Sequence, residues 1–102
     1  MEAQIIKEKD NTTTVKFAGR LDTPAAQKIA KSLVTLQDEP AKGTIVLDCK
    51  ELEYISSSGL RIFLTLRKAA EAKGGKVIVK DINEEIRNVF MMTGFLNIFE
   101  IV

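Results

Sequence analysis

The sequence predicts an α/β domain with a mixed, mostly parallel sheet, in the order strand, strand, helix, strand, helix, strand, helix, strand. Short runs rich in Ile, Val and Thr alternate with longer segments whose apolar residues recur every three or four positions. Strands that alternate with helices are joined by crossovers, which make neighbouring strands parallel. The sequence shows no repeat and no linker, so we expect one domain over residues 1–102.

The first two predicted strands, residues 3–8 and 13–17, are separated by a short turn and form an antiparallel hairpin. Thr23 and Pro24 then suit the N-cap and the first position of a helix. The segment 38–43 ends this helix with a proline and a glycine. The apolar face, which we expect to cover one side of the sheet, consists of Ala26, Ile29, Ala30, Leu33 and Leu36.

Residues 44–48 form a short run in which three consecutive apolar residues, 45–47, precede an aspartate. Such a run is typical of a central parallel strand that is buried on both faces. A second helix is expected over residues 57–72, because its apolar residues keep helical spacing and Lys-Gly-Gly at 73–75 stops it.

The last third of the chain predicts a strand at 76–79, a third helix and a final strand at 97–102. Asp81 has capping-box spacing to the glutamate three residues on, which places it at the start of the third helix. This helix runs through Phe90, and Gly94 closes it.

Composition excludes several functional classes. There is no histidine, the side chain most often used as a general base and as a metal ligand, so we expect no enzyme, no metal and no cofactor. The net charge of +1 comes from interspersed acids and bases, which is not typical of a nucleic-acid-binding protein. Cys49 is the only cysteine and is interpreted as a buried apolar residue. With no secretory signal or membrane-length apolar run, we expect a cytoplasmic protein that does not bind membranes.

Three consecutive serines, Ser56, Ser57 and Ser58, stand between the exit of the central strand and the first turn of the second helix. Open α/β sheets place their functional sites at such junctions. One interpretation is that a serine caps the helix and the others fill the loop. The other is that a hydroxyl accepts a phosphate, whose charge would meet free N–H groups and the positive end of the helix dipole.

Four segments of the chain together resemble the STAS domains, and specifically the bacterial anti-sigma factor antagonists. The resemblance covers essentially the whole chain and rests on four motifs in order: Phe-Ala-Gly-Arg-Leu-Asp at 17–22, Ile-Val-Leu-Asp at 45–48, Tyr-Ile-Ser-Ser-Ser-Gly-Leu at 54–60 and Phe-Met-Met-Thr-Gly-Phe at 90–95.

The resemblance implies a small binding protein that regulates transcription by partner switching. In the unphosphorylated state it would bind an anti-sigma factor, which is a serine kinase of the histidine-kinase-like ATPase fold, and so release a sigma factor. The kinase would inactivate the antagonist by phosphorylation, and a serine phosphatase would restore it. We expect a monomer.

The family motif typically reads Asp-Ser-Ser-Gly, and its acceptor matches Ser57. Ser56 stands where the aspartate is usual and is the alternative acceptor, while Ser58 is expected to cap the helix. Asp22 matches the acid of a family loop beside the acceptor, although a cap or turn role is equally open. The resemblance therefore implies a partner-binding surface made of Asp22, Ser56, Ser57, Ser58, Gly59 and Leu60.

Two other functions stay open at this point. The chain could be a STAS unit that serves as a scaffold in a larger signalling assembly without phosphorylation, or a STAS domain that binds a nucleotide or another small ligand. For Met91, Met92 and Phe95, core packing is favoured over an adaptable partner surface.

Overall fold

The computed structural model describes residues 2–37 and 43–102, apart from the side chains of 34–37. Five strands and three helices follow the predicted order, and one short 3₁₀ helix is added. Their bounds are β1 Glu2–Lys7, β2 Thr12–Leu21, α1 Thr23–Gln37, β3 Thr44–Ile55, α2 Ser57–Ala72, β4 Lys76–Lys80, α3 Glu84–Thr93, η1 Phe95–Asn97 and β5 Glu100–Ile101.

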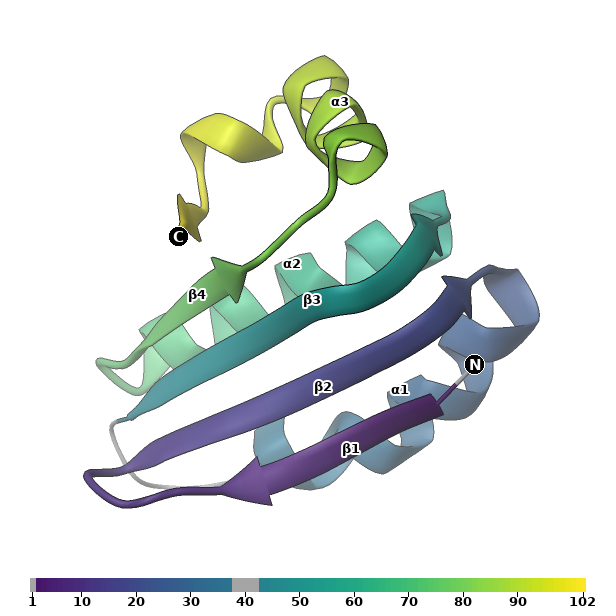
Figure 1. Cartoon of the computed structure of the whole chain (residues 1–102). Helices are drawn as coiled ribbons and strands as arrows, with labels where there is room; N and C mark the ends of the chain where they lie inside the picture. The colour runs from purple at the N-terminus through teal and green to yellow at the C-terminus, as the bar shows by residue number, and fades with distance from the viewer. Residues whose placement is uncertain (1, 38–42) are drawn as a thin grey trace.

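The strands form a single sheet in the spatial order β1-β2-β3-β4-β5 (Figure 1). β1 pairs with β2 in antiparallel orientation, and all other neighbours are parallel. β3 occupies the centre of the sheet, as predicted. The carboxyl ends of β2 and β3 therefore lie side by side, with Leu21 opposite Ile55.

The sheet is covered by helices on one face. α1 and α2 lie behind the sheet in Figure 1, and no helix crosses its front. Val15, Leu47 and Val79 face the helices and are buried, whereas Val46 and Ile78 on the opposite side are only half-buried. The prediction that the central strand is buried on both faces is therefore wrong, because α1 and α2 follow parallel strands on the same side of the sheet.

The core contains a cluster of phenylalanines. Phe63 on α2 packs against three other rings, with centroid distances of 5.4 to 6.4 Å. Its partners come from β2, from α3 and from the segment after η1, so a single side chain joins distant parts of the chain. The cluster consists of Phe17, Phe63, Phe90, Phe95 and Phe99, all buried.

Several element ends differ from the prediction. β2 and β3 continue to Leu21 and Ile55, past the residues that the apolar pattern marks as strands. They continue because the two strands still pair with each other there, although the register between them shifts twice. The final strand is only two residues long, because the end of η1 and the turn that follows it occupy residues 97–99 of the expected segment. The predicted end of the first helix at 38–43 lies mostly outside the described residues. The bounds of α2 and the left-handed Gly94 at the end of α3 (φ 82°) agree with the prediction.

Two helix starts also differ from the prediction. Asp22, and not Thr23, caps α1, since its Oδ1 accepts a hydrogen bond of 3.0 Å from the N–H of Ala25. Asn83, and not Asp81, caps α3, since its Oδ1 accepts from the N–H of Ile86 at 2.8 Å. In both cases the residue directly before the helix has an acceptor side chain that reaches the first turn.

Candidate functional site

The site lies where β2 and β3 end and α1 and α2 begin. Two hydrogen bonds join these junctions. The backbone N–H of Ser56 donates to the carbonyl of Leu21 at 2.8 Å, and the Ser58 hydroxyl donates to the Thr23 hydroxyl at 3.4 Å. The structure therefore brings the predicted Asp22 loop and the serine run together.

Ser56 is the N-cap of α2. Its backbone is extended (φ −88°, ψ 171°), and its Oγ accepts from the N–H of Gly59 at 3.2 Å. Its residue surface is only 8% exposed. The expectation that Ser58 caps the helix is therefore wrong, because Ser58 already lies within the first turn, where its hydroxyl is directed to Thr23.

Ser57 is the first residue of α2 and is exposed, whereas Ser58 is half-buried. Among the three serines, Ser57 thus offers the hydroxyl that a large protein could reach most easily. No acidic residue occupies the first turn of α2. The free N–H groups and the dipole of the helix therefore act on an anion here without competition from a carboxylate in that turn.

Gly59 and Leu60, which were expected in the partner-binding surface, are buried in the free protein. A Cβ atom at Gly59 would lie 2.8 Å from side-chain atoms of both Leu21 and Ile55. The lack of a side chain at Gly59 therefore lets the start of α2 pack closely on the ends of β2 and β3.

Asp22 is half-buried and engaged in capping α1 through both its side chain and its carbonyl, which accepts from the N–H of Ala26 at 2.8 Å. Its placement beside the serine run agrees with the family loop, and its hydrogen bonds agree with the cap role.

Nearby, the Arg20 guanidinium lies over the Tyr54 ring, 4.3 Å from its centroid. Sequence reasoning missed this pair because it depends on the register between β2 and β3.

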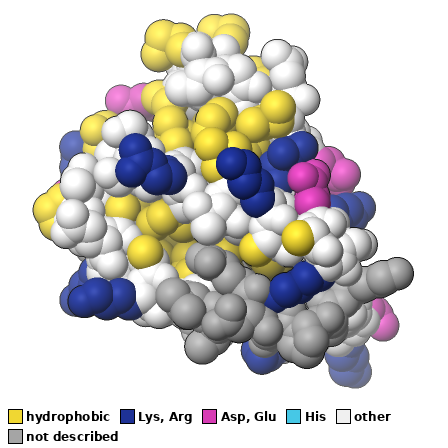
Figure 2. All heavy atoms as spheres, turned by 180° about the vertical axis from the view of Figure 1, so that it is seen from behind, with side chains coloured by type: hydrophobic (Ala, Val, Ile, Leu, Met, Phe, Trp, Pro, Cys, Tyr) yellow, Lys and Arg dark blue, Asp and Glu magenta, His cyan; other side chains and the backbone are white. Residues whose placement is uncertain are grey.

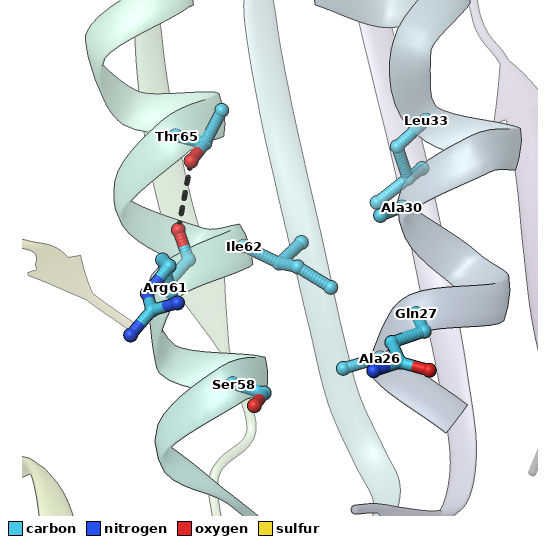
Figure 3. Close-up of a pocket in the computed structure, with 8 residues that line it drawn as sticks. All are labelled: Ala26, Gln27, Ala30, Leu33, Ser58, Arg61, Ile62 and Thr65. Carbon is cyan, nitrogen blue, oxygen red and sulfur yellow. Dashed lines mark hydrogen bonds between the residues drawn. The ribbon is translucent and has the colours of Figure 1, made fainter. Parts of the chain in front are cut away.

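A groove of about 310 Å³ opens between α1 and α2 and reaches the site at Ser58. Figure 3 shows Ala26 and Ala30 on α1 facing Ile62 on α2, which points across the groove toward α1. The alanines were predicted to lie on the apolar face of the first helix, but a groove was not. The small size of these two side chains, four residues apart, is the signal that could have indicated it.

Apolar side chains also gather at the end of the molecule formed by α3 (Figure 2). Met91 and Met92 are 61% and 77% exposed, so the expectation that they pack in the core is wrong. Phe95 is buried, as expected. The α3 face that carries Ile86 and Phe90 meets the core, and this leaves the two methionines on the outside.

Cys49 is fully buried in β3. Burial, together with the negative charges of Asp48 and Asp81, raises the pKa of its thiol to about 12, so the thiol stays protonated near neutral pH. A protonated, inaccessible thiol is neither a nucleophile nor a metal ligand.

Within residues 2–37 and 43–102, no three His, Cys, Asp or Glu side chains cluster as metal ligands would. No helix in the described part of the chain is long and apolar enough to cross a membrane.

Comparison with known proteins agrees with this geometry. The family model of the STAS domain matches residues 3–102. The anti-sigma-B factor antagonist of Bacillus subtilis is 29% identical over 96 residues, which cover 94% of this chain and 86% of that protein. The protein of the same name from Listeria monocytogenes is 30% identical over 99 residues, covering 94% and 84%.

Solved structures share the fold. The anti-sigma factor antagonist SpoIIAA in its unphosphorylated form matches with a TM-score of 0.78 and 23% identity, over 99% of this chain and 87% of that one. The phosphorylated form of SpoIIAA from Bacillus matches with a TM-score of 0.78 and 24% identity, over 99% and 91%. The names of the sequence relatives describe antagonists of anti-sigma factors, in line with the expectation of a binding protein. The chain belongs to the STAS domain family and, within it, to the anti-sigma factor antagonists.

Proposed function

We propose that this protein is a partner-switching antagonist controlled by phosphorylation of Ser57. In the unphosphorylated state it binds an anti-sigma factor, a serine kinase of the histidine-kinase-like ATPase fold, and thereby releases a sigma factor. The observation that carries this proposal is the exposed Ser57 hydroxyl in the first turn of α2, held beside the Asp22 loop. The names of the curated relatives support the role, and SpoIIAA has a phosphorylated form.

The environments of the serines favour Ser57 over Ser56 as the acceptor. Phosphorylation of Ser56 would remove the hydroxyl that caps α2 from a site that is 8% exposed. A kinase would have to open the helix start to reach it, whereas Ser57 needs no such change.

A phosphate on Ser57 should leave the fold intact. It adds a charge of about −1.5 to −2 at a helix N-terminus, where free N–H groups and the helix dipole stabilise anions. Phosphorylation therefore blocks binding through charge and bulk at the surface, without a rearrangement of the core.

The proposed partner surface consists of Asp22, Ser57 and Ser58, with Ser56, Gly59 and Leu60 holding the helix start beneath it. A serine phosphatase would restore the binding form. We further propose that the chain acts in the cytoplasm as one domain over residues 1–102 and as a monomer, without nucleic acid or a membrane as partner.

The test begins with intact mass and phosphopeptide mapping of the protein from its own host, before and after phosphatase treatment. A single phosphate on Ser57 is expected. Ser57→Ala should bind the kinase persistently and Ser57→Asp should bind it poorly. Thr93→Ala, at an exposed hydroxyl at the end of α3 and away from the serine run, is the matched control and should bind and release like the wild type. Phosphate on Ser56, or equal binding by both Ser57 variants, would contradict the proposal.

A further inference from the structure

The two helices beside the groove are strongly basic. α1 and α2 together contain five basic residues and one acidic residue, although the whole chain has a net charge of only +1. The single acid, Glu71, pairs with Arg67 at 3.2 Å. The remaining surface of the chain is therefore net acidic, and positive charge is concentrated on the helices that form the groove.

Three of the basic residues stand near the groove. Arg61 lines it, Lys68 lies two turns further along the same side of α2, and Lys31 lies one turn after the groove residue Gln27 on α1. All three are exposed, and none forms an ion pair with another residue that the structure describes. The Arg61 guanidinium points away from α1 in Figure 3, but its long exposed side chain can turn toward an anion above the groove by changing rotamer.

The groove itself is apolar and shallow. Its floor is formed by Ala26, Ala30 and Leu33 from α1 and Ile62 from α2, and polar groups stand at its edges. Its volume of about 310 Å³ is at the lower limit for ligand pockets, and its lining residues extend over about two turns of each helix. An apolar groove between two helices can accommodate the apolar side chains of a third helix, in the helix-in-groove mode of recognition.

We propose that the groove between α1 and α2 binds an acidic amphipathic helix of the anti-sigma factor. Apolar side chains of that helix fill the space between Ala30 and Ile62, and its carboxylates lie against Arg61, Lys68 and Lys31. Opposite charges at the edge of the groove speed association and select the partner, while the apolar contact holds it.

This inference rests on the proposed function and extends it. Ser58 lines the end of the groove, and Ser57 directly precedes it in the chain. A phosphate on Ser57 therefore adds about two negative charges at one end of a basic groove. This phosphate repels an acidic helix from that end of the groove, so electrostatic repulsion explains why phosphorylation would prevent binding.

The test places a photo-crosslinking amino acid, p-benzoylphenylalanine, at the exposed groove residue Gln27 in the full chain, expressed in its own host. The cross-linked peptide is sequenced by mass spectrometry. The yield of this adduct is then measured in two groove variants. Arg61→Glu reverses a charge at the edge of the groove, and Ala30→Leu fills its floor. Arg87→Glu on α3 and Ala72→Leu at the exposed end of α2 are the matched controls, and melting curves verify that every variant folds.

The expected adduct is a peptide with more acidic than basic residues and with apolar residues at helical spacing. Arg61→Glu and Ala30→Leu should reduce it by about tenfold, and the controls should not. Absence of an adduct, a neutral or basic peptide, or an adduct that neither groove variant affects would overturn the inference.

The Ser57→Asp variant distinguishes a failure of this inference from a failure of the proposed function. Loss of the adduct in Ser57→Asp with no effect of either groove variant overturns the acidic helix and leaves the switch in place. An adduct that depends on the groove but persists in Ser57→Asp supports the acidic helix and counts against phosphorylation as the control.

Discussion

Ser56 and Ser57 are neighbours in the chain, but their hydroxyls have opposite environments. The extended backbone of Ser56 turns its hydroxyl back over the first turn of α2, where it accepts from Gly59. Ser57 has already entered the helix, and its side chain lies on the exposed side. One residue therefore stabilises the helix start, while the next is available to a partner.

Alanine substitutions should separate these two roles. Ser56→Ala removes the cap and should lower the free energy of unfolding by about 1 kcal/mol. Ser57→Ala removes an exposed hydroxyl and should change it by less than about 0.5 kcal/mol. Urea denaturation of both variants measures the difference, and equal stabilities would show that Ser56 does not cap the helix in solution.

Cys49 should make stability depend on alkaline pH. Burial raises the pKa of the folded-state thiol from 9.0 to about 12, so folding favours the neutral thiol. Its contribution is fully present below pH 9 and is lost as the pH rises toward 12, where the unfolded chain releases a proton that the folded chain keeps. The stability advantage of the wild type over Cys49→Ala, measured by urea denaturation, should therefore shrink as the pH rises from 8 to about 11. A constant difference would contradict the raised pKa.

At the scale of the elements, each helix begins where a side chain accepts from its first turn. Asp22, Ser56 and Asn83 serve α1, α2 and α3 in this way. The caps of α1 and α2 lie at the carboxyl ends of adjacent parallel strands, which places two positive helix ends next to each other. This arrangement positions the site, because it brings Thr23 and Ser58 into contact.

Asn83 also forms a hydrogen bond outside its own helix, in addition to capping α3. Its Nδ2 donates to the carbonyl of Leu52 at 3.0 Å and so ties α3 to the central strand. Asn83→Ala loses both hydrogen bonds and should lower the free energy of unfolding by about 2 kcal/mol. Asn88→Ala, at an exposed position within α3, is the control and should cost less than about 0.5 kcal/mol. If denaturation gave equal losses for the two variants, Asn83 would not hold α3.

At the scale of the whole molecule, the phenylalanine cluster joins the C-terminal segment to the sheet. Phe63 contacts rings from β2, α3 and the segment after η1. Because α2 carries both Phe63 and Ser57, the same helix anchors the core and presents the proposed phosphorylation site. A firmly held α2 agrees with a switch that acts at the surface.

Phe63→Ala should be severely destabilising, because it opens a cavity beneath all of these elements. We expect a loss of about 3–5 kcal/mol, a large part of the roughly 5–15 kcal/mol typical of a domain. Met92→Ala should change stability by less than about 0.5 kcal/mol, since Met92 is 77% exposed. Thermal and urea denaturation provide both values, and a small loss for Phe63→Ala would show that the cluster is not central to the fold.

The sequence by itself determined the order of strands and helices, the bounds of α2 and the stop at Gly94, because local signals specify these features. Helical periodicity, a capping hydroxyl and a glycine act over a few residues and need no distant partner. The serine junction was visible for the same reason, since a run of hydroxyls before a helix is a local pattern.

Only the tertiary structure decided which serine caps, which serine is exposed and which face of the sheet is covered. The cap bond itself is local, but contacts between distant residues hold the serines in place: Leu21 accepts from the N–H of Ser56, and Thr23 accepts from the hydroxyl of Ser58. Apolar spacing shows that Ala30 and Met92 belong to helices, but it does not show whether another element covers them. Burial is a property of the packed molecule, and for that reason the groove and the exposed methionines emerged only from the fold.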